Sequence, residues 1–205
     1  MARDRQSIVK MSRREGYALH PKAHKILVRR TNKPGQSQGY NPRAKTSQYA
    51  LQLREKQKVK RLYGLLERQF ANLMNEATRQ KGEAGQVLLQ LLERRADNAI
   101  YRAGFAPSRR AARQLVTHGH FTLNDVRVDI PSIRMKPGDV LKVRDHSLKT
   151  DYFKRLDDTS PAPSDIPGWL KVNRKKLELS VTGLPTREDA EPDINEQLIV
   201  EYYSR

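Results

Sequence analysis

The spacing of apolar residues changes near residue 120, and this change constrains the fold more than any other feature. Leucine, phenylalanine and alanine recur every three or four positions in residues 62–74 and 88–103, as expected for helices with one buried face. In residues 121–144 apolar and polar residues alternate, which is typical of short strands, and the turn residues Asn124-Asp125 and Lys136–Asp139 separate them. Helices followed by a small antiparallel sheet predict an α+β fold.

Local start and stop signals predict the individual elements. Ser47 is a suitable N-cap for the first helical run, and Gly64 is a point at which that run could divide in two. Residues 86–105 form a second helical run, and Ser108 is the N-cap expected for a third helix. Strand-like character returns towards the C-terminus at 169–172, 177–181 and 198–203.

Five segments are expected along the chain. The first 46 residues mix basic residues with turn-forming pairs such as Asn41-Pro42 and show little periodicity, which predicts an extended arm or, alternatively, a disordered basic tail. The segments are a basic extended arm at 1–46, a helical N-terminal domain at 47–91, a small helix-and-sheet domain at 92–156, an acidic proline-rich loop at 157–168, and C-terminal strands with a tail at 169–205 that pack on the rest.

Positive charge is concentrated in the first part of the chain. The 205 residues include 40 Lys and Arg and 23 Asp and Glu, for a net charge of +17. Residues 1–61 hold 17 basic and 3 acidic side chains, whereas residues 157–205 hold 6 basic and 10 acidic ones. A nucleic acid is therefore the first partner expected, because each phosphate that is neutralised releases condensed counterions. An anionic membrane surface is the second.

Several classes of protein are disfavoured by what the sequence lacks. There is no cysteine, which excludes disulfides and thiolate zinc sites. No apolar run approaches the roughly 20 residues of a membrane span. The first 16 residues lack the apolar stretch of a signal peptide, so we expect an intracellular protein that does not engage a membrane.

The stretch SRRAARQLVTHGH (residues 108–120) is the strongest candidate for a binding surface. On a helix, Arg109, Arg110 and Arg113 share one arc with Thr117, and the apolar residues of the stretch gather on another face. The sequence puts no carboxylate in this arc, which favours phosphate binding over a merely solvated face. A DNA-reading helix is the alternative, but a sheet follows at once and the long basic arm suits a folded RNA.

Other chemistry finds little support. His118 and His120, like His20 and His24, have no cysteine or nearby carboxylate to complete a metal site, so no metal is expected. Gly119 is better explained as a helix stop. Motifs of nucleotide-binding loops, hydrolases and zinc proteases are absent from the sequence, so we expect no catalytic residue, no cofactor and no small-molecule substrate.

Four segments of the chain resemble one known family. The segment LERRADNAIYRAGFAPSRRAARQLVTHGHFTLNDVRVDIPSIRMKPGDVLKVRD (92–145) is similar to the small RNA-binding domain of small-subunit ribosomal protein four. Residues 7–16 and 54–70 resemble the N-terminal domain of that family, and residues 184–205 resemble its C-terminal signature. These segments are spread over almost the whole chain, from residue 7 to residue 205. An RNA-modifying enzyme or stress factor that carries the same small domain remains the alternative, but such proteins lack these flanking segments.

The resemblance implies a structural protein of the small ribosomal subunit, cytoplasmic, ribosome-bound and of bacterial type. It implies a primary binder of small-subunit ribosomal RNA that docks at a multi-helix junction and nucleates assembly. It also implies contact with ribosomal protein five at an interface that affects decoding accuracy, a position near the point where messenger RNA enters, and possible repression of the protein's own messenger. In this family the C-terminal segment returns to the helical domain, so that the small domain is an insertion.

From the charge pattern and this resemblance we expect a defined set of RNA-binding residues. In the small domain they are Arg94, Arg95, Arg102, Ser108, Arg109, Arg110, Arg113, Thr117, His118 and His120; in the helical domain Arg54, Lys56, Lys58, Lys60 and Arg61; in the arm Arg13 and Arg14. The chain departs from the family pattern in three places. It has no N-terminal cysteine cluster for zinc, it has Asn124-Asp125 where Asn-Gly is common, and its smaller residues Ala96, Ala99 and Ala103 thin the packing of one helix.

Overall fold

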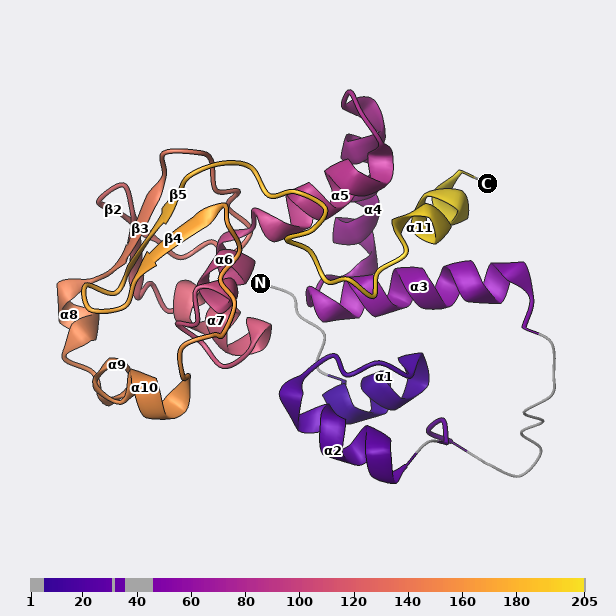
Figure 1. Ribbon diagram of the computed structural model, residues 1–205, viewed down its shortest axis with the longest axis horizontal. Helices are drawn as coiled ribbons and strands as arrows, with labels where there is room; N and C mark the ends of the chain where they lie inside the picture. Colours follow the sequence, from indigo (N-terminus) through magenta and orange to yellow (C-terminus); the bar gives the residue numbers. More distant parts are fainter. Residues whose placement is uncertain (1–5, 31, 36–45, 205) are drawn as a thin grey trace. The chain divides into compact units, whose positions relative to one another are not determined.

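The computed structural model describes residues 6–30, 32–35 and 46–204, and these divide into two compact units (Figure 1). The described parts of residues 1–88 and 193–205 form the first unit, and residues 89–192 form the second. The elements in chain order are α1 (Ile8–Glu15), α2 (Pro21–Arg29), α3 (Gln48–Leu62), α4 (Glu67–Arg79), α5 (Ala84–Glu93), α6 (Ala96–Arg102), α7 (Arg109–Thr117), β1 (Phe121–Leu123), β2 (Val126–Val128), β3 (Val140–Val143), α8 (Asp145–Leu148), α9 (Asp151–Lys154), α10 (Leu156–Thr159), β4 (Leu170–Asn173), β5 (Glu178–Val181) and α11 (Glu196–Tyr203).

The first unit is helical, as the periodicity predicts. Ser47 caps α3 by accepting a hydrogen bond from the backbone N–H of Ala50, and Gly64 lies between α3 and α4 with a φ of +67°. Phe70, Leu73 and Met74 form the buried stripe of α4. The predicted division of the first helical run at Gly64 is therefore confirmed.

Two expectations for the ends of the chain are wrong. Residues 8–29 form the helices α1 and α2 instead of an extended arm, and His20 caps α2 through a hydrogen bond from the N–H of Lys22 to its Nδ1. The rest of that segment, at 1–5, 31 and 36–45, lies outside the described residues. Residues 198–203 form part of the helix α11 instead of a strand, because Asn195 caps it and Ile199 and Tyr203, one turn apart, face the same way.

The helical run of residues 86–105 is interrupted where one continuous helix was expected. Arg95 has an extended backbone (φ −65°, ψ 138°) and forms an isolated β-bridge with Arg134. The N–H of Met135 donates to the carbonyl of Arg94 at 2.7 Å. These backbone pairings separate α5 from α6.

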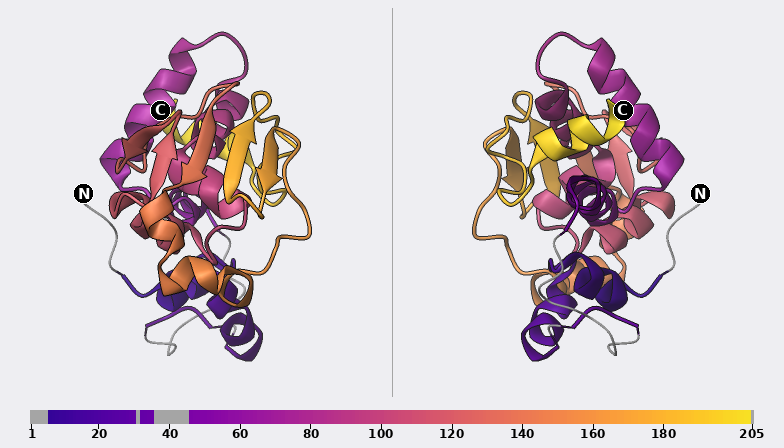
Figure 2. Two further views of the ribbon diagram at one scale, coloured as in Figure 1. Left: turned by 90° about the vertical axis from the view of Figure 1, so that its left-hand side faces the viewer. Right: turned by 90° about the vertical axis from the view of Figure 1, so that its right-hand side faces the viewer.

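The second unit contains a five-stranded antiparallel sheet in the order β2-β1-β3-β5-β4 (Figure 2, left). The two-residue hairpin turn is confirmed: Leu123 pairs with Val126, and Asn124 and Asp125 both have positive φ. Strands β4 and β5 extend the sheet, so the small domain continues beyond its expected end at residue 156. From Asp193 onwards the chain belongs to the first unit, and α11 contacts α3 there.

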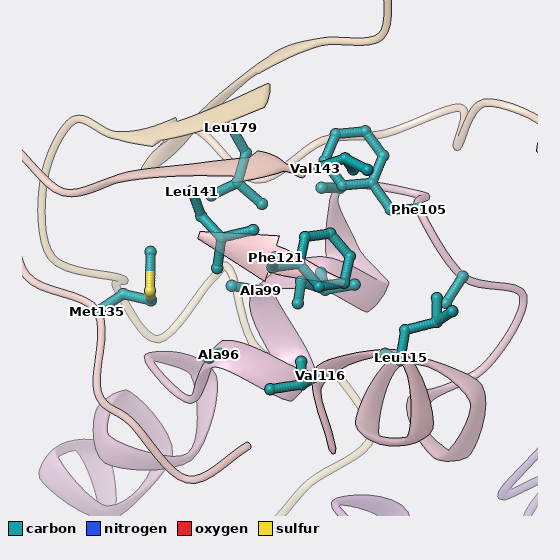
Figure 3. Packing of buried hydrophobic residues seen from close by; sticks show 14 of the residues in the cluster. Ala96, Ala99, Phe105, Leu115, Val116, Phe121, Met135, Leu141, Val143 and Leu179 are labelled. Carbon is teal, nitrogen blue, oxygen red and sulfur yellow. The ribbon is translucent and has the colours of Figure 1, made fainter. Parts of the chain in front are cut away.

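The core of the second unit lies between α6, α7 and the inner face of the sheet (Figure 3). Phe121 and Leu141 from the sheet, together with Met135, pack against Ala99 of α6 and Val116 of α7, and all five are fully buried. Ala96 and Ala103 are buried in the same cluster, so the small residues of α6 form part of the core. Within the described residues, no helix is long and apolar enough to cross a membrane.

Gly104 closes α6 and permits a close approach by the loop after α10. Its φ is +73°, and its carbonyl accepts hydrogen bonds from Ser160 Oγ and Arg174 Nη1 at 2.9 and 3.0 Å. A Cβ at this position would lie 2.4 Å from Cδ of Pro163. The loop can therefore pack here because the side chain is absent.

We expect Gly104→Ala to destabilise the second unit by about 1–3 kcal/mol more than Gly138→Ala, the cost of overpacking. Gly138 also has a positive φ, of 89°, but no atom lies within 4 Å of a Cβ placed there. Urea unfolding followed by the fluorescence of buried Trp169 measures both variants. Equal destabilisation by the two variants would show that backbone strain at a positive φ, and not the contact with Pro163, explains the need for glycine at position 104.

Candidate nucleic-acid interface

Helix α7 is anchored on one face and open on another, as the sequence predicts. The Ser108 hydroxyl caps it by accepting a hydrogen bond from the N–H of Ala111. Ala112, Leu115 and Val116 face the core. Arg110 and Thr117 are exposed, whereas Ser108 itself is buried in its capping role. The outer face of α7 can therefore meet a partner without disturbing the core.

Two arginines of the predicted site belong to a closed ring of polar side chains. Arg102 binds Glu93 in a bidentate manner, with N–O distances of 3.2 and 3.0 Å. Arg109 Nη2 lies 3.0 Å from Glu191 Oε1, and Arg102 Nη2 lies 3.6 Å from the same oxygen. Asn98 completes the ring: it accepts from Arg109 Nε at 2.8 Å and donates to Glu93 at 2.7 Å. We call these five residues the Glu93–Glu191 ring.

A second cluster, beside the ring in sequence, is centred on Asp97. Its carboxylate accepts hydrogen bonds from Arg95 Nε and Nη2 at 3.0 and 2.7 Å. Arg113 Nη1 lies 3.2 Å from Asp97 Oδ2. Both Asp97 and Arg95 are buried. Arg95 and Arg113 are therefore held by a carboxylate inside the unit.

The folded chain thus brings carboxylates to an arc that has none in the local sequence. Arg109 faces Glu191 and Arg113 faces Asp97, and each arginine side chain is only about a tenth exposed. Arg110, on the same helix, is exposed. The structure brings the three predicted arginines together on α7 but gives them different surroundings. Of the three, Arg110 is the one whose side chain is exposed.

The C-terminal end of α7 gathers two histidines and a further arginine. His118 is exposed, and His120 Nδ1 lies 3.0 Å from the hydroxyl of Ser147. Burial, followed by the nearby His118 and Arg144, lowers the pKa of His120. Arg144 Nη1 donates to the carbonyl of Gly119 at 3.1 Å. In the part of the chain that the structure describes, no group of three or more His, Cys, Asp or Glu side chains is placed to hold a metal ion.

Arg127 is an exposed residue that the sequence reasoning missed. It lies on β2, and its guanidinium sits against Gly119, within 2.6 Å of where a Cβ would be. Strand alternation places Arg127 on the face opposite Val128, but the hairpin register is needed to bring it beside the end of α7. Arg110, Thr117, His118 and Arg127 are hereafter called the outer α7 surface.

The predicted cations of α3 are also paired with carboxylates. Lys56 and Lys60 both bind Glu67, at 2.6 and 2.8 Å, and Lys56 is buried over the ring of Tyr202. Lys58 lies 2.8 Å from Glu55 and donates to the carbonyl of Asp193. These contacts hold α3, the start of α4 and the C-terminal segment together.

The remaining predicted cations of the first unit surround α1. Arg54 and Arg61 both pair with Glu15, whose side chain is fully buried. Burial raises the pKa of Glu15 more than the two guanidiniums lower it. Arg13 donates to the carbonyl of Asn32, and Arg14 is exposed. Arg14 is the more accessible of these two arginines of α1.

Glu67 predicts a specific dependence of stability on pH. Partial burial opposes its ionisation, but the hydrogen bonds and charges of Lys56 and Lys60 prevail and lower the pKa of Glu67 to about 2. A carboxyl with a depressed pKa in the folded state stabilises the fold above its unfolded value of 4.5 and loses that contribution as the pH falls towards 2. We expect the difference in unfolding free energy between the native chain and Glu67→Gln to be largest at neutral pH and to shrink below pH 4.5. A difference that is constant from pH 7 to 2 would contradict this.

Two family models match successive parts of the chain. The sequence model of the family Ribosomal protein S4/S9 N-terminal domain matches residues 3–93, and that of the S4 domain matches residues 94–141. The border between them coincides with the end of α5.

Full-length relatives agree with this assignment. The small ribosomal subunit protein uS4 of Chlorobaculum tepidum is 50% identical over 206 residues, covering 100% of both chains. The proteins of the same name from Chloroherpeton thalassium and Chloroflexus aurantiacus are 49% and 48% identical, again over the whole of both chains. The resemblance found in the sequence is thereby confirmed, and the chain belongs to the uS4 family of small ribosomal subunit proteins.

Proposed function

We propose that this chain is a structural constituent of the small ribosomal subunit, cytoplasmic and of bacterial type, which binds small-subunit ribosomal RNA. The observation that carries the proposal is the identity of about 50% over the entire length to relatives named for that subunit. The net charge of +17 supports a phosphate-rich partner. The exposed outer α7 surface gives that partner a place to bind.

Phosphate contacts at this surface are expected to set affinity more than sequence preference. Arg110 and Arg127 can each bind phosphate oxygens through two N–H groups, and the exposed His118 adds a donor. Selectivity for small-subunit RNA then comes from the shape of a folded junction, because such a junction can bring phosphates to several separated cationic side chains at the same time. In this proposal the chain acts early, as a primary binder that nucleates assembly.

A non-enzymatic role fits the assignment of the chain's segments to the two units. The two family models together cover residues 3–141, and β4, β5 and α11 complete the two units. The segments that flank the S4 domain therefore have structural roles in the fold. A turnover assay that detected base modification of ribosomal RNA by the pure protein would contradict this part of the proposal.

The test of RNA binding compares RNA classes at several salt concentrations. We expect the full chain to bind small-subunit ribosomal RNA in preference to random duplex DNA of equal length. The logarithm of the binding constant should fall linearly with the logarithm of salt, by about 0.9 for each duplex phosphate contacted. Equal affinity for the two nucleic acids would contradict the proposal.

A protein partner is proposed for a separate surface of the first unit. Tyr49 and Leu51 at the start of α3 are exposed, and the ring centroid of Tyr49 lies 5.9 Å from that of Tyr202 on α11. Aromatic residues at a surface are typical of protein interfaces. We assign this surface to ribosomal protein five and, through it, to decoding accuracy. The double variant Tyr49→Ala with Leu51→Ala, assembled into the small subunit, should bind purified ribosomal protein five more weakly than the native chain does, with unchanged affinity for RNA. Undiminished binding of ribosomal protein five would contradict the assignment.

We propose two further roles, which the resemblance to this family implies. In the assembled subunit the chain would lie near the point where messenger RNA enters, and its own messenger is a second RNA that it could bind and repress. Binding of the pure protein to the leader of its own messenger, measured against a scrambled leader, decides the second role. Equal affinity for the two leaders would contradict repression.

A further inference from the structure

Glu191 is the most exposed member of the Glu93–Glu191 ring and the one with the least support. Its side chain is 21% exposed, compared with 0% for Glu93, 11% for Arg109 and 19% for Arg102. It comes from the irregular segment between β5 and α11, and it reaches both arginines through the single oxygen Oε1. The other members come from, or adjoin, the helices α5, α6 and α7.

The two arginines each have partners besides Glu191. Arg102 keeps both hydrogen bonds to the buried carboxylate of Glu93. Arg109 keeps its hydrogen bond to Asn98, and its guanidinium lies 4.6 Å from the ring centroid of Tyr101. Loss of Glu191 therefore removes the carboxylate oxygen that lies near both guanidiniums and leaves each arginine with the contacts just named.

The position held by Glu191 suits a phosphate oxygen. A single anionic oxygen there accepts from Arg109 Nη2 at 3.0 Å and lies 3.6 Å from Arg102 Nη2. Phosphodiester oxygens carry the same charge and accept the same charge-assisted hydrogen bonds, and a pair of guanidiniums binds either anion. On the same helix, Arg110 of the outer α7 surface follows Arg109 directly.

We propose that Glu191 occupies an RNA phosphate site between Arg102 and Arg109 in the free protein, and that RNA displaces it by rotation of its side chain. The proposal rests on the proposed RNA-binding function and adds to it a built-in competitor. Glu191 holds the position between the two guanidiniums until a phosphate in the correct place replaces it. An RNA that cannot place a phosphate between the two arginines gains no binding energy from them. Glu191 therefore raises selectivity for the correct RNA at the expense of affinity.

The arginine pair makes Glu191 unlike the other carboxylates of its segment. Glu188, three residues earlier, is exposed, and Asp189 accepts hydrogen bonds from the N–H and hydroxyl of Thr186. Burial opposes ionisation of Glu191, but Arg109 and Arg102 prevail and lower its pKa. Glu191 is thus ionised at neutral pH, where it can compete with RNA phosphates.

The test compares three variants of the full chain for affinity to a small-subunit ribosomal RNA fragment. Glu191→Gln removes the competing charge and is expected to raise affinity about three- to tenfold. Glu188→Gln makes the same change of net charge away from the arginine pair and is expected to raise affinity less. Glu191→Asp keeps the charge but shortens the side chain, so that it no longer reaches both arginines, and any gain in its affinity cannot come from net charge.

A double-mutant cycle then connects the effect to the arginine pair. In an Arg109→Gln background, Glu191→Gln is expected to give no gain beyond that of Glu188→Gln. The inference would be overturned if the native chain binds the RNA selectively but Glu191→Gln binds no tighter than Glu188→Gln and Glu191→Asp binds no tighter than the native chain. That result would leave the proposed function intact. A native chain that does not bind the RNA selectively would overturn both. Trp169 fluorescence confirms that each variant is folded, since Trp169 is the only tryptophan and is buried in the second unit.

Discussion

Replacement of Glu93 by glutamine is expected to lower the unfolding free energy of the second unit by about 3–5 kcal/mol, the usual effect of removing one partner from a buried ion pair. Glu93 is fully buried and binds both Arg102 and Asn98. A glutamine amide would keep the shape but direct its NH2 group at N–H donors of Arg102 or Asn98, and the guanidinium of Arg102 would lose its buried counter-charge. The ring that joins α5, α6 and α7 would therefore open at its most buried point.

Urea unfolding followed by Trp169 fluorescence measures this effect within the second unit. Glu188→Gln is the matched control, because it removes one carboxylate charge at an exposed position. We expect the control to change stability by less than about 0.5 kcal/mol. A Glu93→Gln variant as stable as the control would mean that the ring contributes nothing to the fold.

Charge reversal on the outer α7 surface is expected to have the largest effect on binding. Arg110→Glu combined with Arg127→Glu should weaken binding to small-subunit ribosomal RNA by about 100-fold, because repulsion replaces attraction at each phosphate that these arginines bind. The salt dependence should also become shallower by about 0.9 for each phosphate that the variant no longer neutralises. Both side chains are exposed, so the fold should survive.

The matched control for this pair reverses two charges elsewhere in the second unit. Lys175→Glu with Lys176→Glu makes the same change of net charge in the turn between β4 and β5, where both side chains are exposed. It should weaken binding much less than the α7 pair. Equal weakening would mean that affinity follows net charge alone and that α7 has no special role.

Elements with strong apolar periodicity could be predicted from the sequence. The buried stripes of α4 and α7 and the hairpin at Asn124-Asp125 follow from local spacing and turn chemistry. Helix α11 could not be predicted in the same way. Its Leu-Ile-Val-Glu-Tyr-Tyr run favours a strand by composition, and packing on α3 decides for a helix. The helices α1 and α2 were missed because basic residues and Pro21 obscure their short apolar stripes.

The position of the candidate site could be predicted from the sequence, but the surroundings of its individual arginines could not. Helical geometry places Arg109, Arg110 and Arg113 on one arc of α7, and the structure agrees. Their partners come from elsewhere: Asp97 is 16 residues from Arg113, and Glu191 is 82 residues from Arg109. Such pairings depend on the tertiary fold, so a pattern read over a few turns of helix cannot distinguish an arginine held by a carboxylate from one that is exposed.

The most direct test of the account is a footprint of the full chain on naked small-subunit ribosomal RNA, measured by backbone cleavage with hydroxyl radicals. We predict protection confined to the strands of one multi-helix junction, and loss of that protection with Arg110→Glu and Arg127→Glu but not with Lys175→Glu and Lys176→Glu. Protection spread evenly along the RNA, or unchanged by reversal of the α7 charges, would contradict a specific RNA-binding role for this surface.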